Sequence, residues 1–283
     1  MESFWDKDFA VDVIYRSMRL VHDIRNSGSW KLKPDGTLLT EVDPANEEFL
    51  RKELCKNGEL FIGEESIERE GIDFVERSLK ARTWVVDPID GTAPFAHHLP
   101  TWAISAGYMV NGVLTDGVFA LPDLNQCFVT DGPEVLACFD VSGKPSEWQW
   151  HQMEMPEDKW NPGGMITFGQ GFTRHGNLNL PNPVIASGSA VHALSCVVAQ
   201  NAIAYIGSGK IWDLASVFPM LLRLGYSMKY YGGNYIDANV ATNECFILDA
   251  HDPHCWGPAK GGTFVCSRPG NREIVEKAIV SLG

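Results

Sequence analysis

A short apolar run that ends in two aspartates is the feature that most constrains this chain. Trp84–Val86 is typical of a buried strand, and the next six residues read Asp-Pro-Ile-Asp-Gly-Thr. Asp87 and Asp90 are three residues apart. Pro88 fixes its own φ and Gly91 allows backbone conformations that other residues avoid, so both are typical of a turn. Carboxylates that converge at a strand end are the ligands that a hard cation such as Mg²⁺ prefers. A turn that only closes a loop has the same residues, so both interpretations are open at this point.

The interpretation of three further features depends on this turn. If a helix begins at Gly91–Thr92, its first backbone N–H groups form an anion site beside the carboxylates. Glu64 follows a predicted strand over 59–63, and Asp213 lies in the first turn of a predicted helix over 212–224. Taken alone, Glu64 is typical of an exposed acidic loop and Asp213 of a residue that favours the helix dipole. Their metal-ligand interpretation depends on their occurring together with the two aspartates of the turn.

The composition is typical of a globular protein and argues against several other classes. Of 283 residues, 45% are hydrophobic and 21% are charged, which is typical of a globular chain with one large domain or two packed lobes. No uncharged apolar run approaches the roughly 18 to 20 residues that a membrane span needs. The net charge of −13 and the lack of a basic patch argue against binding to a nucleic-acid backbone. We therefore expect neither a membrane nor a nucleic acid as a partner.

The cysteines predict a reducing compartment. Seven cysteines are scattered without a Cys-x-x-Cys pair, and the acidic N-terminal residues lack the pattern of a signal peptide. We therefore predict reduced thiols in the cytoplasm. One local group, His251, His254 and Cys255, contains metal-binding residue types. It lacks a fourth ligand at a defined spacing, so a loop is the better interpretation than a structural zinc site.

The first half of the chain predicts two helices and an antiparallel meander. Apolar residues at steps of three and four predict a helix over 10–24. A second helix is expected from about 43 to 55, with Asp43 as its N-cap. Apolar runs separated by turns over 103–139, with Asn111–Gly112 between two of them, predict strands joined by hairpins.

The pattern changes in the second half, where strands and helices alternate. The segment 141–164 is rich in Pro, Gly, Trp and charged residues, so we place the boundary between two lobes, 1–140 and 141–283, there. Helices mixed with strands throughout the chain imply an α/β architecture of layered sheets covered by helices.

Three separated segments resemble one known family. The sequences Gly-Glu-Glu-Ser at 63–66, Trp-Val-Val-Asp-Pro-Ile-Asp-Gly-Thr at 84–92 and Trp-Asp-Leu-Ala-Ser at 212–216 resemble, in this order, the motifs of the inositol monophosphatase family. This family is part of the Mg²⁺-dependent, Li⁺-sensitive phosphatase superfamily. Softer similarities lie at Thr40–Asp43, Ser187–Ala190 and Gly262–Ile279, so that the resemblance covers most of the chain.

The resemblance implies a fold and an activity. The fold is a layered αβαβα sandwich of the inositol monophosphatase and fructose-1,6-bisphosphatase type. The activity is that of a phosphoric monoester hydrolase, which uses Mg²⁺ and water to hydrolyse a small phosphorylated metabolite. Members of the family commonly form homodimers, so a homodimer is expected here.

The resemblance also implies ligands for two or three Mg²⁺ ions. Glu64, Asp87 and the carbonyl of Ile89 hold one ion in this interpretation. Asp87, Asp90 and Asp213 hold a second. Four acidic side chains would repel a phosphate dianion unless cations lie between them, so the implied chemistry is physically coherent.

Other residues receive roles in the reaction by the same resemblance. Thr92 and Glu64 place the attacking water, and Asp43, together with Lys33, orders the water network behind it. Backbone N–H groups of Gly91 and Thr92 bind the phosphate. The resemblance implies that Asp90, Gly91, Thr92, Gly188, Ser189 and Ala190 bind substrate. His192 and Lys210 are candidate contacts from their own positions in this sequence, and a Lys210 side chain that points to solvent is the alternative.

Three departures from the family pattern concern the substrate. After Thr92 the family usually continues with Thr-Asn-Phe or a similar run, whereas this chain has Ala93–Phe95 and a stiffening proline. Inositol-preferring members carry a glutamate shortly before the Trp-Asp motif, whereas Tyr205–Lys210 contains no acid. His192 follows the substrate loop and is either a core residue or a substrate contact. Substrate contacts by His97 and His98 are equally open.

These departures leave several substrates open. The candidates are inositol or another cyclitol phosphate, histidinol phosphate, a sugar bisphosphate and a 3′-phosphonucleotide. Because the acid before the Trp-Asp motif is missing, we expect that inositol 1-phosphate is not the best substrate. A non-catalytic relative that binds a phosphorylated ligand or a partner is the alternative of another class. The complete set of acids and Thr92 favours the enzyme.

Overall fold

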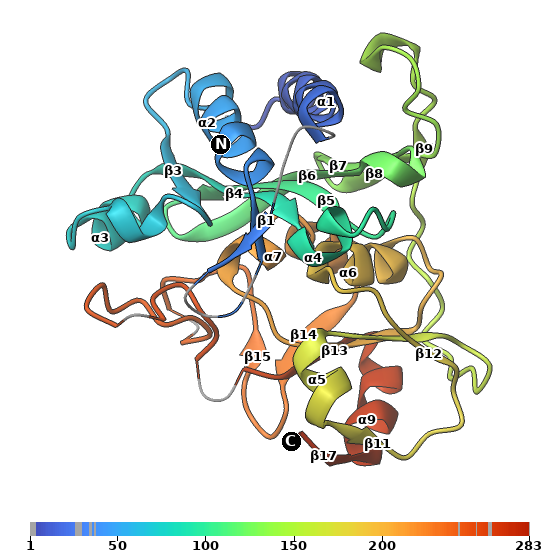
Figure 1. Ribbon diagram of the computed structural model, residues 1–283. Coiled ribbons are helices and arrows are strands. Elements are labelled where there is room, and N and C mark those ends of the chain that lie inside the picture. Colours follow the sequence, from blue (N-terminus) through green and yellow to red (C-terminus); the bar gives the residue numbers. More distant parts are fainter. Residues whose placement is uncertain are drawn as a thin grey trace.

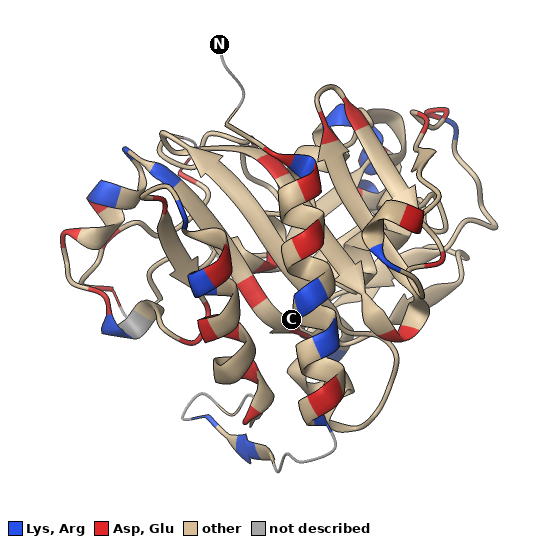
Figure 2. Cartoon of the chain, turned by 90° about the horizontal axis from the view of Figure 1, so that it is seen from above, with Lys and Arg blue, Asp and Glu red and all other residues tan. Residues whose placement is uncertain are grey.

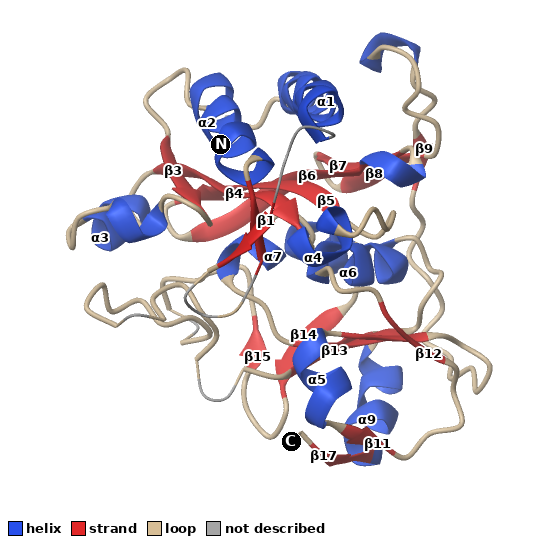
Figure 3. Cartoon of the chain, in the orientation of Figure 1, coloured by secondary structure: helices blue, strands red, loops and turns tan. Residues whose placement is uncertain are grey.

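Helical layers and sheets alternate through the molecule as helix, sheet, helix, sheet and helix (Figure 3). This arrangement confirms the predicted αβαβα sandwich. The computed structural model describes residues 4–25, 30–33, 36, 38–242, 244–252, 254–259 and 262–282. None of the helices within these ranges combines the length and the apolar character that crossing a membrane needs.

The first layer contains α1 (Lys7–Ile24) and α2 (Val42–Leu54), which lie across one face of a sheet. Figure 2 looks down on this layer and shows charged residues of both signs along the outer faces of the two helices. The predicted helix over 10–24 is confirmed. The prediction that Asp43 is the N-cap of α2 is wrong, because Glu41 takes that position and Asp43 lies inside the first turn. Its carboxylate is used instead in contacts described below.

The first sheet has seven strands in the order β3-β4-β5-β6-β7-β8-β9 (Figure 1). β3 and β4 are parallel, and every later neighbouring pair is antiparallel, which confirms the meander and its hairpin at Asn111–Gly112. The apolar run at Trp84–Val86 belongs to a longer strand that continues to Asp90, with a register shift between Asp87 and Asp90. The strands are β3 (Leu60–Gly63), β4 (Arg82–Asp90), β5 (Ala103–Val110), β6 (Val113–Leu121), β7 (Gln126–Asp131), β8 (Glu134–Cys138) and β9 (His151–Gln152).

The second sheet has six strands in the order β12-β10-β13-β16-β14-β15. The chain crosses from β9 of the first sheet to β10 of the second between Gln152 and Ile166, a range that overlaps the second half of the segment 141–164. The division into two domains stays a prediction. The strands of the second sheet are β10 (Ile166–Phe168), β12 (Val184–Ala186), β13 (Ala204–Gly207), β14 (Ser227–Tyr230), β15 (Tyr235–Ile236) and β16 (Phe264–Ser267).

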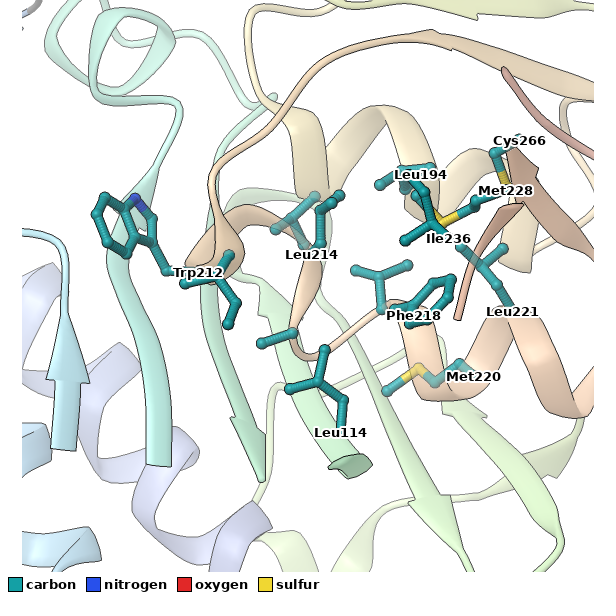
Figure 4. Close-up of a cluster of buried hydrophobic side chains, with 14 of the residues drawn as sticks. Leu114, Leu194, Trp212, Leu214, Phe218, Met220, Leu221, Met228, Ile236 and Cys266 are labelled. Carbon is teal, nitrogen blue, oxygen red and sulfur yellow. The ribbon is translucent and has the colours of Figure 1, made fainter. Parts of the chain in front are cut away.

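Between the two sheets lie α6 (Ala190–Val198), α7 (Ile211–Leu214) and α8 (Phe218–Arg223). Their apolar side chains form one core with strands of both sheets. Figure 4 shows Leu214 and Phe218 between Leu114 of the first sheet and Met228 and Cys266 of the second. This shared core fixes the position of α7, which carries Asp213, relative to β4, which carries Asp87 and Asp90.

The predicted single helix over 212–224 is wrong, because the helix is interrupted between α7 and α8. The backbone of Ala215 and Ser216 lies so close to Gly107 and Gly117 that a Cβ atom on either glycine would overlap it. In addition, the hydroxyls of Ser105 and Ser216 are 2.7 Å apart. This close approach to β5 and β6 replaces a regular helical turn.

The remaining described elements are short or lie at the outside. Among them, α3 lies beside β3 and ends shortly before the start of β4, and α4 follows the carboxyl end of β4. The helices α5 and α9 cover the outer face of the second sheet (Figure 1). Their bounds are α3 (Phe74–Ser78), α4 (Thr92–Ala96), α5 (Gln170–His175), α9 (Pro269–Ala278), the 3-10 helices η2 (Ile67–Arg69), η3 (Pro122–Leu124) and η4 (Pro145–Glu147), and the strand pairs β1 (Trp30–Leu32) with β2 (Leu38–Thr40) and β11 (Asn177–Leu178) with β17 (Ile279–Ser281).

Candidate active site

Three aspartates from two distant parts of the chain converge beneath the end of β4. Asp87 and Asp90 come from β4, and Asp213 comes from α7. One oxygen of each carboxylate lies within 4.8 Å of the others. Asp87 and Asp90 are almost completely buried, and Asp213 is partly buried. The structure therefore brings together the three acids that were expected to share one cation.

Burial of this cluster opposes its negative charge. Loss of solvation, together with the neighbouring carboxylates, raises the pKa of Asp213 to about 8. The same causes raise the pKa of Asp87 well above its ordinary range. Burial also raises the pKa of Asp90 to about 6, although several hydrogen-bond donors lower it in part. Oxygen ligands that carry uncompensated negative charge fit a hard divalent cation, which relieves their repulsion.

Side-chain hydrogen bonds from α1 and α2 stabilise the turn that carries Asp87 and Asp90. The side-chain Nδ2 of Asn46 donates to the carbonyl of Pro88 at 2.8 Å. Asn46 is oriented in turn by Ser17, whose hydroxyl donates to Asn46 Oδ1 at 2.7 Å. Both side chains are completely buried. Sequence reasoning missed this pair, although a signal existed: each is a polar residue on the apolar face of its helix.

The same turn is held from the opposite side by α6. The hydroxyl of Ser189, the N-cap of α6, donates to Asp90. The backbone N–H groups of Ala190 and Val191 donate to the two oxygens of Asp90 at 3.2 and 2.8 Å. These donors favour the charged form of Asp90 and fix its orientation. Ser189 and Ala190 were predicted to bind substrate, and in the structure they bind this carboxylate.

Thr92 and Asp43 lie next to the cluster of three aspartates and contact each other. The hydroxyl of Thr92 is 3.0 Å from Asp43 Oδ1 and 3.2 Å from the carbonyl oxygen of Ile89, so it can donate to either. The other oxygen of Asp43 accepts from the backbone N–H of Thr40 at 2.9 Å. A short helix, α4, begins at Thr92, after Gly91 with a φ of 84°. Donation to Asp43 leaves the lone pairs of Thr92 Oγ1 available to accept a hydrogen bond from water.

Glu64 lies outside the group of three aspartates and pairs with a lysine. Lys33 Nζ is 3.2 Å from Glu64 Oε1 and 2.6 Å from Glu65 Oε1. Although burial alone would lower it, the charges of Glu64 and Glu65 raise the pKa of Lys33. Burial and the Glu64 charge raise the pKa of Glu65 to about 7. The backbone N–H of Glu65 donates to Glu47 Oε2 at 2.8 Å, which anchors this loop on α2. The role of Glu64 as a metal ligand stays a prediction.

Comparison with known proteins identifies the family. The model of the inositol monophosphatase family matches residues 10–251. The chain belongs to this family. It is accordingly a phosphoric monoester hydrolase, and enzymes of this kind act on small phosphorylated substrates.

Individual relatives of this phosphatase carry different names. A histidinol-phosphatase of Mycobacterium tuberculosis is 34% identical over 226 residues, which are 75% of this chain and 82% of the relative. A fructose-1,6-bisphosphatase/inositol-1-monophosphatase of Thermotoga maritima is 37% identical over 121 residues, 42% of this chain. That match spans 44% of the relative's length. A solved IMPase structure from Thermotoga maritima has the same fold, with a TM-score of 0.68, 21% identity, and coverage of 96% of this chain and 95% of that chain.

The other predicted substrate residues of this phosphatase lie in different surroundings. His192 is buried in α6, where loss of solvation lowers its pKa to about 4. Lys210 is exposed, with its Nζ 5.2 Å from the centre of the Trp212 ring. Gly188 and His97 line a cavity of about 350 Å³ beside α4, whereas Lys210 lines a larger one. His98 is exposed and does not line either cavity.

The described part of the chain contains one group of three or more side chains with metal-ligating atoms in mutual reach, and it is the aspartate cluster. His251, His254 and Cys255 do not form such a group there. This placement agrees with the loop interpretation of the histidine and cysteine residues.

Proposed function

We propose that this phosphatase hydrolyses the monoester of a small metabolite with Mg²⁺ ions held by its acidic cluster. Asp87, Asp90 and Asp213 would hold one ion. Asp87, Glu64 and the Ile89 carbonyl would hold another. The observation that carries this proposal is the convergence of the three aspartates within 4.8 Å, next to the first turn of α4.

The electrostatics of the site support the need for a cation. A phosphate monoester carries about two negative charges near neutral pH. Four acidic side chains would exclude it. When bound, Mg²⁺ supplies the positive charge that admits the phosphate, activates water and stabilises the leaving oxygen.

The residues of this chain contribute position rather than covalent chemistry. The backbone N–H groups of Gly91 and Thr92 would bind the phosphate oxygens. Thr92, which can donate its own proton to Asp43 at 3.0 Å, would accept a hydrogen bond from the attacking water and orient it. Asn46 and Ser189 keep the carboxylates in place from either side of the turn.

For the substrate, we infer that inositol 1-phosphate is not preferred. A carboxylate that accepts hydrogen bonds from a substrate hydroxyl contributes roughly 1.5 to 3 kcal/mol. Tyr205–Lys210 contains no such group. Its absence would weaken selection for a polyol by about tenfold to a hundredfold. Histidinol phosphate, a sugar bisphosphate and a 3′-phosphonucleotide are therefore better candidates, and the histidinol-phosphatase relative supports the first of them.

We also propose that the enzyme acts as a homodimer in the cytoplasm, on the basis of the family resemblance and of the cysteine pattern. Light scattering of the purified protein tests the dimer, and a monomer at micromolar concentration would contradict it. A non-catalytic role is disfavoured because Thr92 and all the acids of the expected set are present.

The decisive experiment measures phosphate release from a panel of substrates. The panel contains inositol 1-phosphate, histidinol phosphate, fructose 1,6-bisphosphate and 3′-phosphoadenosine 5′-phosphate. We expect turnover with Mg²⁺, loss of turnover with EDTA and recovery when Mg²⁺ is restored. Full turnover in metal-free buffer would overturn the proposed mechanism. An advantage of about tenfold or more for inositol 1-phosphate would overturn the substrate inference.

A further inference from the structure

The helix that carries Thr92 is too short to hold its own position. α4 has five residues, and the turn that contains Thr92 is closed by a backbone hydrogen bond from the Phe95 N–H to the Gly91 carbonyl at 3.0 Å. Isolated helices shorter than roughly 12 residues are marginal in water, so the position of such a helix depends on its side-chain contacts. Phe95 follows Thr92 by three residues and is buried. The contacts of Phe95 therefore help to fix where Thr92 lies.

Phe95 belongs to a cluster of four side chains from separate parts of the chain. The guanidinium carbon of Arg25, the C-cap of α1, is 4.7 Å from the centre of the Phe95 ring and 5.3 Å from that of Trp102. The two rings contact each other edge to face, with their centres 4.8 Å apart. Arg25 Nη2 also donates to the Phe95 carbonyl oxygen at 3.4 Å. Together with Asp123 of η3, these residues form what we call the Arg25 cluster.

Asp123 fixes the guanidinium group in this position. Its two carboxylate oxygens accept from Arg25 Nη1 at 2.8 and 2.6 Å, and its Oδ2 also accepts from Trp102 Nε1 at 2.9 Å. The Arg25 side chain is 15% exposed and that of Asp123 is 29% exposed, so solvent screens the pair only in part. A lysine at position 25 would keep the charge but lacks the planar fork that contacts two rings, a carboxylate and a carbonyl at once. The cluster therefore uses the shape of the guanidinium group and not only its charge.

Thr92 links the Arg25 cluster to the acidic site, since its hydroxyl is 3.0 Å from Asp43 Oδ1. The three aspartates of the site lie on β4 and α7, outside α4. Asn46 and Ser189 hold the turn that carries two of them. A shift of α4 would therefore move Thr92 and have little effect on the aspartates.

We propose that the Arg25 cluster positions the Thr92 hydroxyl for the reaction. Arg25, Trp102 and Asp123 are positioning residues, because they hold α4 through Phe95 and do not touch the reacting atoms. A misplacement of about 1 Å by a change far from the chemistry can lower a rate about a hundredfold, so a small shift of α4 is enough. This inference rests on the proposed function, from which it takes the role of Thr92 in orienting the attacking water.

Arg25→Lys tests the proposal against a matched change on the same helix. Arg16→Lys is the control, because Arg16 Nη1 also pairs with a carboxylate, Glu53 at 2.8 Å, and its guanidinium lies over a ring, that of Phe49, but these contacts join α1 to α2. We expect Arg25→Lys to lower kcat about tenfold for the panel substrate that the wild type hydrolyses fastest, with a smaller change in KM. The Mg²⁺ affinity, measured by calorimetry, should stay within about twofold of the wild-type value. In Arg16→Lys both kcat and the Mg²⁺ affinity should stay within about twofold.

Hydrogen exchange reports on α4 without any turnover. The amide of Phe95 is expected to exchange about tenfold faster in Arg25→Lys, and within about twofold of the wild-type rate in Arg16→Lys. Unchanged exchange in Arg25→Lys would overturn the anchoring of α4. Faster exchange with an unchanged kcat would also overturn the inference, because the cluster would then serve the fold alone. A loss of kcat accompanied by an equal loss of Mg²⁺ affinity would mean that the whole site is disturbed and not Thr92 in particular.

Asp123→Asn covers the case in which Arg25→Lys does not fold. It keeps the shape of the side chain and removes the charge that fixes the Arg25 guanidinium. It is expected to lower kcat and to speed the exchange of the Phe95 amide in the same direction, by smaller factors. An Asp123→Asn variant with lower stability and an unchanged kcat would overturn the inference.

A double-mutant cycle with Thr92→Val decides whether the effect passes through Thr92. Thr92→Val keeps the shape of the side chain and removes the hydroxyl. In this background we expect Arg25→Lys to lower kcat by no more than about twofold. Fold-changes that multiply would overturn the inference and leave the proposed function intact. An unchanged kcat in Thr92→Val would overturn the proposed role of Thr92 and this inference with it, and if Thr92→Val has no measurable rate, the single-variant rates and the hydrogen exchange decide.

Discussion

Asp213 is a carboxylate placed where burial and neighbouring charge both oppose ionisation. Its pKa of about 8 shows that the folded chain holds a charge cluster which only a proton or a cation neutralises. The family motifs implied that this residue is a ligand together with Asp87 and Asp90, and the structure places the three carboxylates within 4.8 Å of one another. They did not predict Ser17 and Asn46, because a hydrogen bond between two helices and a turn depends on how the helices cross, which no local pattern contains.

Asp213→Asn tests the cluster at its most perturbed member. The change keeps the shape of the side chain and removes one negative charge. Loss of a direct ligand is expected to lower kcat by more than the roughly tenfold to hundredfold typical of residues that support ligands. Phosphate release at saturating Mg²⁺ measures the effect, with circular dichroism as the check on folding. Asp23→Asn, an exposed change on α1, is the control. A variant that keeps more than about a third of the wild-type rate would show that Asp213 serves only the helix dipole.

Asn46→Ala tests the support of the turn. The variant leaves the Pro88 carbonyl without its donor at 2.8 Å, so the aspartates lose a fixed orientation. We expect the Mg²⁺ affinity to fall by about tenfold to a hundredfold, and the free energy of unfolding to fall by about 1–3 kcal/mol. A calorimetric Mg²⁺ titration and denaturant unfolding measure the two effects. Ser17→Ala is expected to act in the same direction with a smaller effect. Lower stability with unchanged Mg²⁺ affinity would mean that Asn46 has a packing role alone.

At the scale of elements, the position of α7 depends on glycines in the strands beneath it. Gly107 on β5 and Gly117 on β6 allow the backbone at Ala215 and Ser216 to approach the sheet. The amphipathic pattern over 212–224 correctly predicted helix in the regions of α7 and α8. It wrongly predicted that one continuous helix joins them. The apolar period of a helix is the same whether it is continuous or interrupted, so the pattern does not report the break.

Gly107→Ala tests this contact. The added methyl group overlaps the backbone of Ala215 and forces α7 away from the sheet. We expect a loss of about 1–3 kcal/mol in the free energy of unfolding, together with weaker Mg²⁺ binding, because Asp213 moves with α7. Gly171→Ala is the control, since a Cβ atom there meets no atom within 4 Å. If Gly107→Ala lowers stability without weakening Mg²⁺ binding, the position of α7 does not limit the cluster.

At the scale of the whole molecule, protons and Mg²⁺ compete for the same carboxylates of the folded protein, and binding of either one stabilises the fold. The pKa of Asp213 rises from an ordinary value of 3.8 to about 8 on folding. Between these values the folded protein binds a proton that the unfolded chain has released. The free energy of unfolding of the metal-free protein therefore falls as the pH rises through this window. Mg²⁺ takes the place of these protons, so its stabilising effect grows with pH.

Thermal unfolding with Mg²⁺ and with EDTA checks this linkage. We expect the difference in Tm between the two conditions to increase from about pH 5 to about pH 8. In Asp213→Asn the increase should be smaller, since one of the titrating groups is gone. A Tm difference that is independent of pH would contradict the assignment of the cluster as the cation site.

The sequence by itself determined the local features of this protein and the chemistry of its site. The helix α1 and the hairpins of the meander depend on residues close together in the chain, and both were predicted. Only the tertiary structure decided that Asp43 binds Thr40 and Thr92 instead of capping α2, and that Ser189 binds Asp90. The physical reason is that turns and helix periods are set by neighbouring residues, whereas these contacts join segments that only the packing of two sheets around α6, α7 and α8 brings together.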